Sequence, residues 1–128
     1  MPVQMKLSAI TLDCADPLAL AAFYRQATGF EPHPKSDADF AGLTTADGLF
    51  IGFQRVAGYR APAWPEQTVP QQLHFDFHVD DLDEAESELV KLGAGKPAHQ
   101  GDQDGYRVLT DPAGHPFCIV RRKNEATA

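Results

Sequence analysis

The sequence predicts an α+β protein in which two tandem βαβββ modules form a curved, cup-shaped mixed sheet with helices on its outer face. Two observations carry this prediction. The order strand, helix, three strands occurs twice along the 128 residues, and the residues of the two copies match when they are superimposed. We therefore expect one domain, residues 1–128, with modules at about 5–56 and 72–122 and a connector at 57–71.

The first module is expected to begin with a strand at 6–14, where apolar and polar residues alternate. A helix follows this strand, because Asp16 is a suitable N-cap, Pro17 suits the first helical position, and Gly29 marks the end of an apolar periodic stretch. Three more strands complete the module, at 30–33, 40–45 and 49–56.

The second module repeats this order. Its first strand, at 72–79, alternates strictly between apolar and polar side chains, and a helix with leucines at helical spacing follows at 82–92 and ends at Gly93. The remaining strands are expected at 96–99, 106–110 and 117–121.

The internal match can be followed residue by residue. A shift of 65 positions superimposes the first strands of the two modules, so that apolar positions fall on apolar positions. The other faces of the two strands then also coincide, with Ala9, Thr11 and Asp13 on His74, Asp76 and His78.

Each helix needs an apolar surface to cover, so we expect Leu73, Phe75 and Phe77 to face a helix. The opposite faces of both modules are then free to form the floor of a small-molecule pocket. The alternative is that these polar positions are the solvated side of an antiparallel sheet. The candidate ligand-binding residues on the floor are Phe50, Gln54, Asp76, His78 and Cys118.

His74 is the candidate catalytic residue, either as a general base or as a hydrogen-bonding contact to the ligand. Cys118 is interpreted as a small buried packing residue; the alternative is a nucleophile. Trp64, in the proline-rich connector, is a candidate ligand-binding residue that would close over the pocket; alternatively, it packs against a partner subunit or the sheet rim.

Composition argues against several classes of protein. Asp and Glu number 18 against 11 Lys and Arg, whereas a nucleic-acid-binding surface is normally basic. No apolar run approaches the roughly 20 residues of a membrane span. Because the N-terminal stretch lacks the pattern of a secretion signal and the two cysteines lie far apart, we expect a cytoplasmic protein with reduced thiols.

Three segments carry a resemblance to a known family: DCADPLALAAFYRQATGF, LHFDFHVDDLDEAESELVKLGA and DPAGHPFCIV. They resemble the vicinal oxygen chelate superfamily, which includes glyoxalase I, extradiol dioxygenases and bleomycin-resistance proteins. More narrowly, the chain resembles glyoxalase-like proteins of actinobacterial type.

The resemblance implies a metal position formed by the first and last strands of each module, which falls here on Ala9, Gly52, His74 and Cys118. Ala9 and Gly52 have no ligating side-chain atoms, so we expect no metal at this position and no cofactor. The implied function is a metal-independent lyase or isomerase acting on an unknown small molecule. The alternative is a non-catalytic protein that sequesters a small molecule, as bleomycin-resistance proteins do; the resemblance also implies a homodimer.

Overall fold

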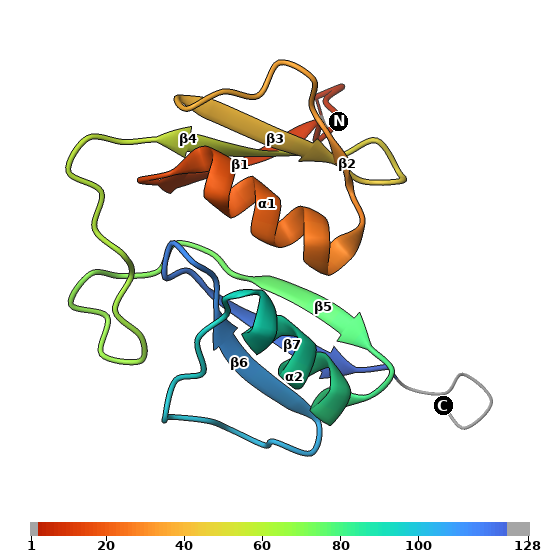
Figure 1. Cartoon of the computed structure of the whole chain (residues 1–128), viewed down its shortest axis with the longest axis vertical. Coiled ribbons are helices and arrows are strands. Elements are labelled where there is room, and N and C mark those ends of the chain that lie inside the picture. Colours follow the sequence, from red (N-terminus) through yellow and green to blue (C-terminus); the bar gives the residue numbers. More distant parts are fainter. Residues whose placement is uncertain (1–2, 123–128) are drawn as a thin grey trace. The chain divides into compact units, whose positions relative to one another are not determined.

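The computed structural model describes residues 3–122, which form two compact units that divide between Tyr59 and Arg60 (Figure 1). Each unit has one mixed β-sheet and one helix packed on it, which confirms the predicted α+β class. No helix within the described residues is long and apolar enough to cross a lipid bilayer.

Unit 1 contains strands β1 (Ala9–Cys14), β2 (Glu31–Pro32), β3 (Phe40–Thr44) and β4 (Phe50–Arg55), and helix α1 (Pro17–Thr28). The strand order is β1-β4-β3-β2, with β1 and β4 parallel and the other pairs antiparallel. The helix begins and ends as expected from its sequence. Asp16 accepts a hydrogen bond from the backbone N–H of Ala19, and Gly29 takes a left-handed conformation at φ 76°.

Helix α1 covers one face of the unit 1 sheet, and the core lies between them (Figure 1). Phe53 is fully buried there, and its ring stacks on Tyr24 of α1 with centroids 5.8 Å apart. The other face of the sheet is not covered by the helix, and we call it the open face of unit 1. It carries Ala9, Thr11 and Asp13 of β1 opposite Phe50, Gly52 and Gln54 of β4.

Unit 2 contains strands β5 (Phe75–Val79), β6 (Tyr106–Thr110) and β7 (Pro116–Arg121), and helix α2 (Leu82–Leu92). The strand order is β5-β7-β6, with β5 parallel and β6 antiparallel to the central strand β7. Asp81 caps the start of α2 through a hydrogen bond from the backbone N–H of Glu84. The helix has the bounds that the sequence predicts.

The predicted strand at 96–99 is wrong. Only a single β-bridge, between Gly95 and Thr110, forms in this region. One physical reason is that Pro97 has no N–H to donate to a neighbouring strand. The other is that the side-chain amide of Gln100 makes the hydrogen bonds to Val108 of β6 that the backbone of an adjacent strand would make. Its Oε1 accepts from the N–H of Val108 at 3.0 Å, and its Nε2 donates to the carbonyl of Val108 at 2.9 Å.

The predicted burial of the apolar face of β5 also needs correction. Helix α2 lies over β7 and β6, so the edge strand β5 receives less cover. Phe77 is half-buried and contacts the buried Phe117 edge-to-face at 6.0 Å, and Phe75 in turn contacts Phe77. Leu73 precedes the strand and is exposed, so its predicted burial against a helix is wrong.

Candidate functional site

A cluster of three side chains forms on the face of the unit 2 sheet opposite Phe117 and Ile119. Asp76 of β5 is the register partner of Cys118 of β7, so adjacent parallel strands place these side chains next to each other. His74 precedes β5 by one residue and contributes its imidazole to the same group. The ligating atoms of His74, Asp76 and Cys118, which we call the His74 cluster, all lie within 4.8 Å of one another.

Asp76 is positioned to stabilise a positive charge on His74. The imidazole Nε2 of His74 lies 3.4 Å from Oδ1 of Asp76, within the range of an ion pair when the imidazole is protonated. The side chains of His74 and Asp76 are 43% and 59% exposed, so a small molecule or ion reaches both from solvent.

The chemistry of Cys118 is set by burial and by Asp76. Burial, the negative charge of Asp76 and a hydrogen bond to its carboxylate together raise the pKa of Cys118 to about 11. Near neutral pH the side chain is therefore a thiol that interacts with Asp76, and it lacks the depressed pKa of a nucleophilic cysteine.

The other predicted site residues lie outside this cluster. His78 is exposed and belongs to the same face of β5, two residues beyond Asp76. Phe50 and Gln54 lie on the open face of unit 1. Trp64 is half-buried, and its indole ring contacts the imidazole of His99 edge-to-face at 5.3 Å.

The open face of unit 1 carries an aromatic surface that the sequence did not reveal as one site. Gly42 of β3 and Gly52 of β4 are direct cross-strand partners. The rings of Phe40 and Phe50 lie over this glycine pair, nearly parallel to each other with centroids 6.1 Å apart. We call Phe40, Phe50, Gly42 and Gly52 the aromatic plate.

The glycines are required for this arrangement. A Cβ at Gly52 would lie 2.7 Å from Cζ of Phe40, and a Cβ at Gly42 would overlap the ring of Phe50. His33, which directly follows β2, meets the ring of Phe50 edge-on at 5.5 Å. The signal available in the sequence was the alternation of Phe and Gly in both strands, but only the strand register shows that the two glycines face each other.

Comparison with known proteins gives the family. A model of the glyoxalase-like domain matches residues 9–120, which is most of the chain. The chain belongs to the glyoxalase-like domain family. None of the curated proteins matches it significantly.

Solved structures share the fold of this glyoxalase-like domain at low sequence identity. A glyoxalase/bleomycin resistance protein/dioxygenase family enzyme from Burkholderia phytofirmans PsJN is 23% identical, with a TM-score of 0.69 and coverage of 91% of this chain and 98% of that chain. A possible glyoxalase from Bacillus cereus is 16% identical, with a TM-score of 0.68 and the same coverage of both chains. The bleomycin-binding protein of Streptomyces verticillus, complexed with copper(II)-bleomycin, is 20% identical, with a TM-score of 0.54 and coverage of 95% and 100%.

The metal position that the family resemblance implies does not fit this glyoxalase-like domain. Unit 1 would supply Ala9 and Gly52, neither of which has a donor atom in its side chain. The space beside Gly52 is filled by the ring of Phe40 and by Oγ1 of Thr11, which would lie 2.7 and 3.0 Å from an added Cβ. A metal held jointly by these four positions is therefore incompatible with this chain.

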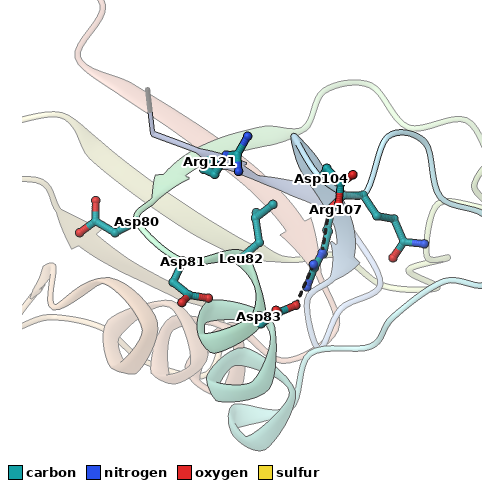
Figure 2. A pocket seen from close by; sticks show the side chains of 8 residues that line it. Asp80, Asp81, Leu82, Asp83, Asp104, Arg107 and Arg121 are labelled. Atoms are coloured by element: carbon teal, nitrogen blue, oxygen red, sulfur yellow. Dashed lines mark hydrogen bonds and ion pairs between the residues drawn. The ribbon is translucent and has the colours of Figure 1, made fainter. Parts of the chain in front are cut away.

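A separate polar cavity of about 280 Å³ lies where α2 begins, and the His74 cluster does not line it. Figure 2 shows that Arg107 of β6 and Asp83 of α2 point toward each other there. Arg107 lies 2.8 Å from Asp83 and 3.3 Å from Glu86, and its side chain is 14% exposed. The hydrogen bond to Asp83 is the main cause of the raised pKa of Arg107. These contacts tie α2 to the sheet, so we interpret Arg107 as structural.

Proposed function

We propose that this glyoxalase-like domain binds a small molecule and acts as a lyase or isomerase in which His74 is the general base. The observation that carries the proposal is the 3.4 Å separation between Nε2 of His74 and Oδ1 of Asp76. With Nε2–H directed at the carboxylate, Nδ1 holds the lone pair that accepts a proton.

The proposed reaction begins with removal of a proton from a carbon next to a carbonyl group of the substrate. The proton moves to Nδ1 of His74, and the electron pair of the C–H bond passes into the adjacent carbonyl to give an enolate. Asp76 stabilises the imidazolium that results. Return of the proton to a different atom completes an isomerisation, whereas loss of a leaving group from the enolate completes a lyase reaction. Neither outcome uses the family's metal position.

Deuterium exchange tests this function across a whole class of candidate substrates. The protein is incubated in D₂O with a panel of small hydroxyketones and keto acids, and exchange of the carbon-bound proton is followed by NMR. Replacing His74 by alanine is expected to slow exchange at least tenfold, equivalent to about 1.4 kcal/mol. Because the side chain is 43% exposed, the thermal midpoint should stay close to that of the parent protein.

Two further variants sharpen the exchange experiment. Asp76→Asn keeps the shape of the side chain but removes its charge, so it is expected to give an intermediate rate. His99→Ala removes an exposed imidazole outside the His74 cluster and should leave the rate unchanged. A compound that exchanges equally fast with the parent protein and with His74→Ala would contradict the role of His74.

The aromatic plate favours a second candidate function, the non-catalytic binding of a planar compound. Phe40 is 39% exposed, so one ring of the plate is available for stacking. The Streptomyces verticillus neighbour is a bleomycin-binding protein, which makes metal-free bleomycin a suitable first probe.

Phe40→Leu is expected to weaken binding of this probe about three- to tenfold, because one stacking partner is lost. Isothermal titration calorimetry measures the change. Phe40→Tyr, the matched control, keeps the ring and should bind like the parent protein. Equal affinity of Phe40→Leu for the probe would rule out the plate as its site.

The proposed setting is a single glyoxalase-like domain that comprises both units and forms a homodimer in the cytoplasm. The family resemblance supports the dimer, and Cys14 and Cys118, which are both thiols, suit a reducing compartment. Sedimentation equilibrium measures the oligomeric state, and a monomer at micromolar concentration would contradict the dimer.

A further inference from the structure

The polar cavity at the start of α2 lies on the other side of the unit 2 sheet from the His74 cluster. Arg107 of β6 is the register partner of Ile119 of β7, whose side chain is buried on the face that α2 covers. Arg121 is two residues beyond Ile119 on β7, so strand alternation places Arg121 on this same face. The two arginines therefore line a cavity that is separate from the candidate catalytic site.

The charged groups on the α2 side of the cavity already have partners. The guanidinium of Arg107 lies 2.8 Å from Oδ1 of Asp83, and its Nε donates to the backbone carbonyl of Gln103 at 3.1 Å. Oδ1 of Asp81 accepts a hydrogen bond from the N–H of Glu84 at the start of the helix. Because these contacts hold α2 and the sheet together, we do not assign these groups to a ligand.

Two side chains that line the cavity carry opposite charges and lack such partners. Among residues 3–122, none forms an ion pair or a hydrogen bond with the guanidinium of Arg121 or with the carboxylate of Asp104. The two residues are close in the sheet, because the N–H of Arg121 donates to the carbonyl of Gly105 at 2.9 Å and Gly105 directly follows Asp104. Figure 2 shows Arg121 at the end of β7 and Asp104 in the loop before β6. The cavity thus presents a positive group close to a negative group.

The size of the cavity limits what it can hold. Its volume of about 280 Å³ lies just below the range of roughly 300–1,000 Å³ that is usual for small-molecule sites. This volume equals that of roughly nine molecules of liquid water. Leu82 is the apolar residue of the lining. A ligand that fits is therefore small, carries charges of both signs and has a short apolar part.

We propose that this cavity binds a free α-amino acid of about the size of valine, as a zwitterion. The carboxylate of the amino acid pairs with Arg121, whose planar guanidinium matches the carboxylate geometry. The ammonium group of the amino acid pairs with the carboxylate of Asp104. An anion without an ammonium group would be repelled by the aspartates of the lining, and a cation without a carboxylate would leave Arg121 without a partner.

The test is a titration of the full chain, labelled with ¹⁵N, with L-valine, followed by NMR of the backbone amides. The amides of Leu82, Gly105 and Arg121 are expected to shift together with a Kd of about 1 mM, because ion pairs in an open cavity are weak. Two analogues each lack one charge: 3-methylbutanoate has no ammonium group, and isobutylamine has no carboxylate. Both analogues should bind at least tenfold more weakly than L-valine.

Variants of the two assigned residues locate the site. Arg121→Gln and Asp104→Ala should each weaken binding of L-valine at least tenfold. Arg60→Gln is the matched control, since Arg60 is exposed and does not line the cavity, and it should bind L-valine like the parent protein. His74→Ala should also bind like the parent, because His74 lies on the other side of the sheet. Circular dichroism of each variant confirms folding.

Four results would overturn the proposal. In the parent protein, these are the absence of shifts at the three amides at about 20 mM L-valine, and binding of either analogue as tight as that of L-valine. Among the variants, they are unchanged affinity in Arg121→Gln and Asp104→Ala, and loss of binding in His74→Ala, which would put the amino acid at the His74 cluster. The amino-acid site does not depend on the general-base function, because binding is measured without a reaction. Absence of deuterium exchange therefore leaves the amino-acid site standing, and absence of L-valine binding leaves the general-base function standing.

Discussion

Replacing Phe53 by alanine is expected to lower the free energy of unfolding by about 3–5 kcal/mol, the usual cost of removing a buried aromatic ring. Phe53 is 0% exposed on β4, and its ring stacks on Tyr24 of α1 at an interplanar angle of 1°. The truncation would leave a cavity between the helix and the sheet, where both surfaces are already tightly packed. Urea denaturation followed by circular dichroism measures the change.

Phe40→Ala is the matched control for Phe53→Ala, because Phe40 lies on the adjacent strand but is 39% exposed on the opposite face. It should cost much less than Phe53→Ala. Similar losses for the two variants, or a loss below about 1 kcal/mol for Phe53→Ala, would mean that α1 does not cover this face.

Replacing Asp111 by alanine is expected to destabilise the protein by about 2–3 kcal/mol. Asp111 is 3% exposed, and its Oδ1 accepts hydrogen bonds from the backbone N–H groups of Ala113 and His115 at 2.9 and 3.0 Å. These bonds hold the turn that leads into β7, the strand that carries Cys118. Without the carboxylate, the N–H groups of Ala113 and His115 in this half-buried turn lose the hydrogen bonds to Oδ1 of Asp111.

Asp111→Asn separates the hydrogen bonds of Asp111 from its charge, because the amide oxygen still accepts from both N–H groups. Its expected loss is about half that of the alanine variant. Thermal unfolding and urea denaturation of the two variants give the comparison. If the alanine variant were as stable as the parent protein, the turn would be held by its backbone alone, through contacts such as the 2.8 Å bond from the N–H of Gly114 to the carbonyl of Asp111.

Elements with local signals could be predicted from the amino-acid sequence. Asp16 with Pro17 predicted the start of α1, and Gly29 predicted its end. Gly93 predicted the end of α2, because capping depends on neighbouring residues only. Strand alternation assigned Asp76 and Cys118 to one face, and the register in which they are partners agrees with that assignment. Successive side chains of a strand point to opposite faces in any tertiary arrangement, because this alternation is a property of the strand backbone.

Features that depend on neighbouring strands emerged only in the folded chain. The strand predicted at 96–99 does not form, because the side-chain amide of Gln100 makes hydrogen bonds to the backbone of Val108 in place of a neighbouring strand. No local sequence pattern reveals this competition for the backbone groups of Val108. The partial exposure of Phe77 follows from the position of α2 over β7 and β6, which the sequence of β5 does not encode.

The candidate site shows the same division. The alternation of side chains along each strand predicted that His74, Asp76, His78 and Cys118 lie on one face. The β5–β7 register and the directions of the side chains then bring the ligating atoms of three of them, His74, Asp76 and Cys118, within 4.8 Å of one another. The aromatic plate likewise exists because the register of β3 and β4 sets Gly42 opposite Gly52 and leaves room for two rings above them. The type of each residue and the strand face on which it lies can be predicted from the sequence. Contact between side chains of different strands depends on strand pairing, which forms only when the sheet folds.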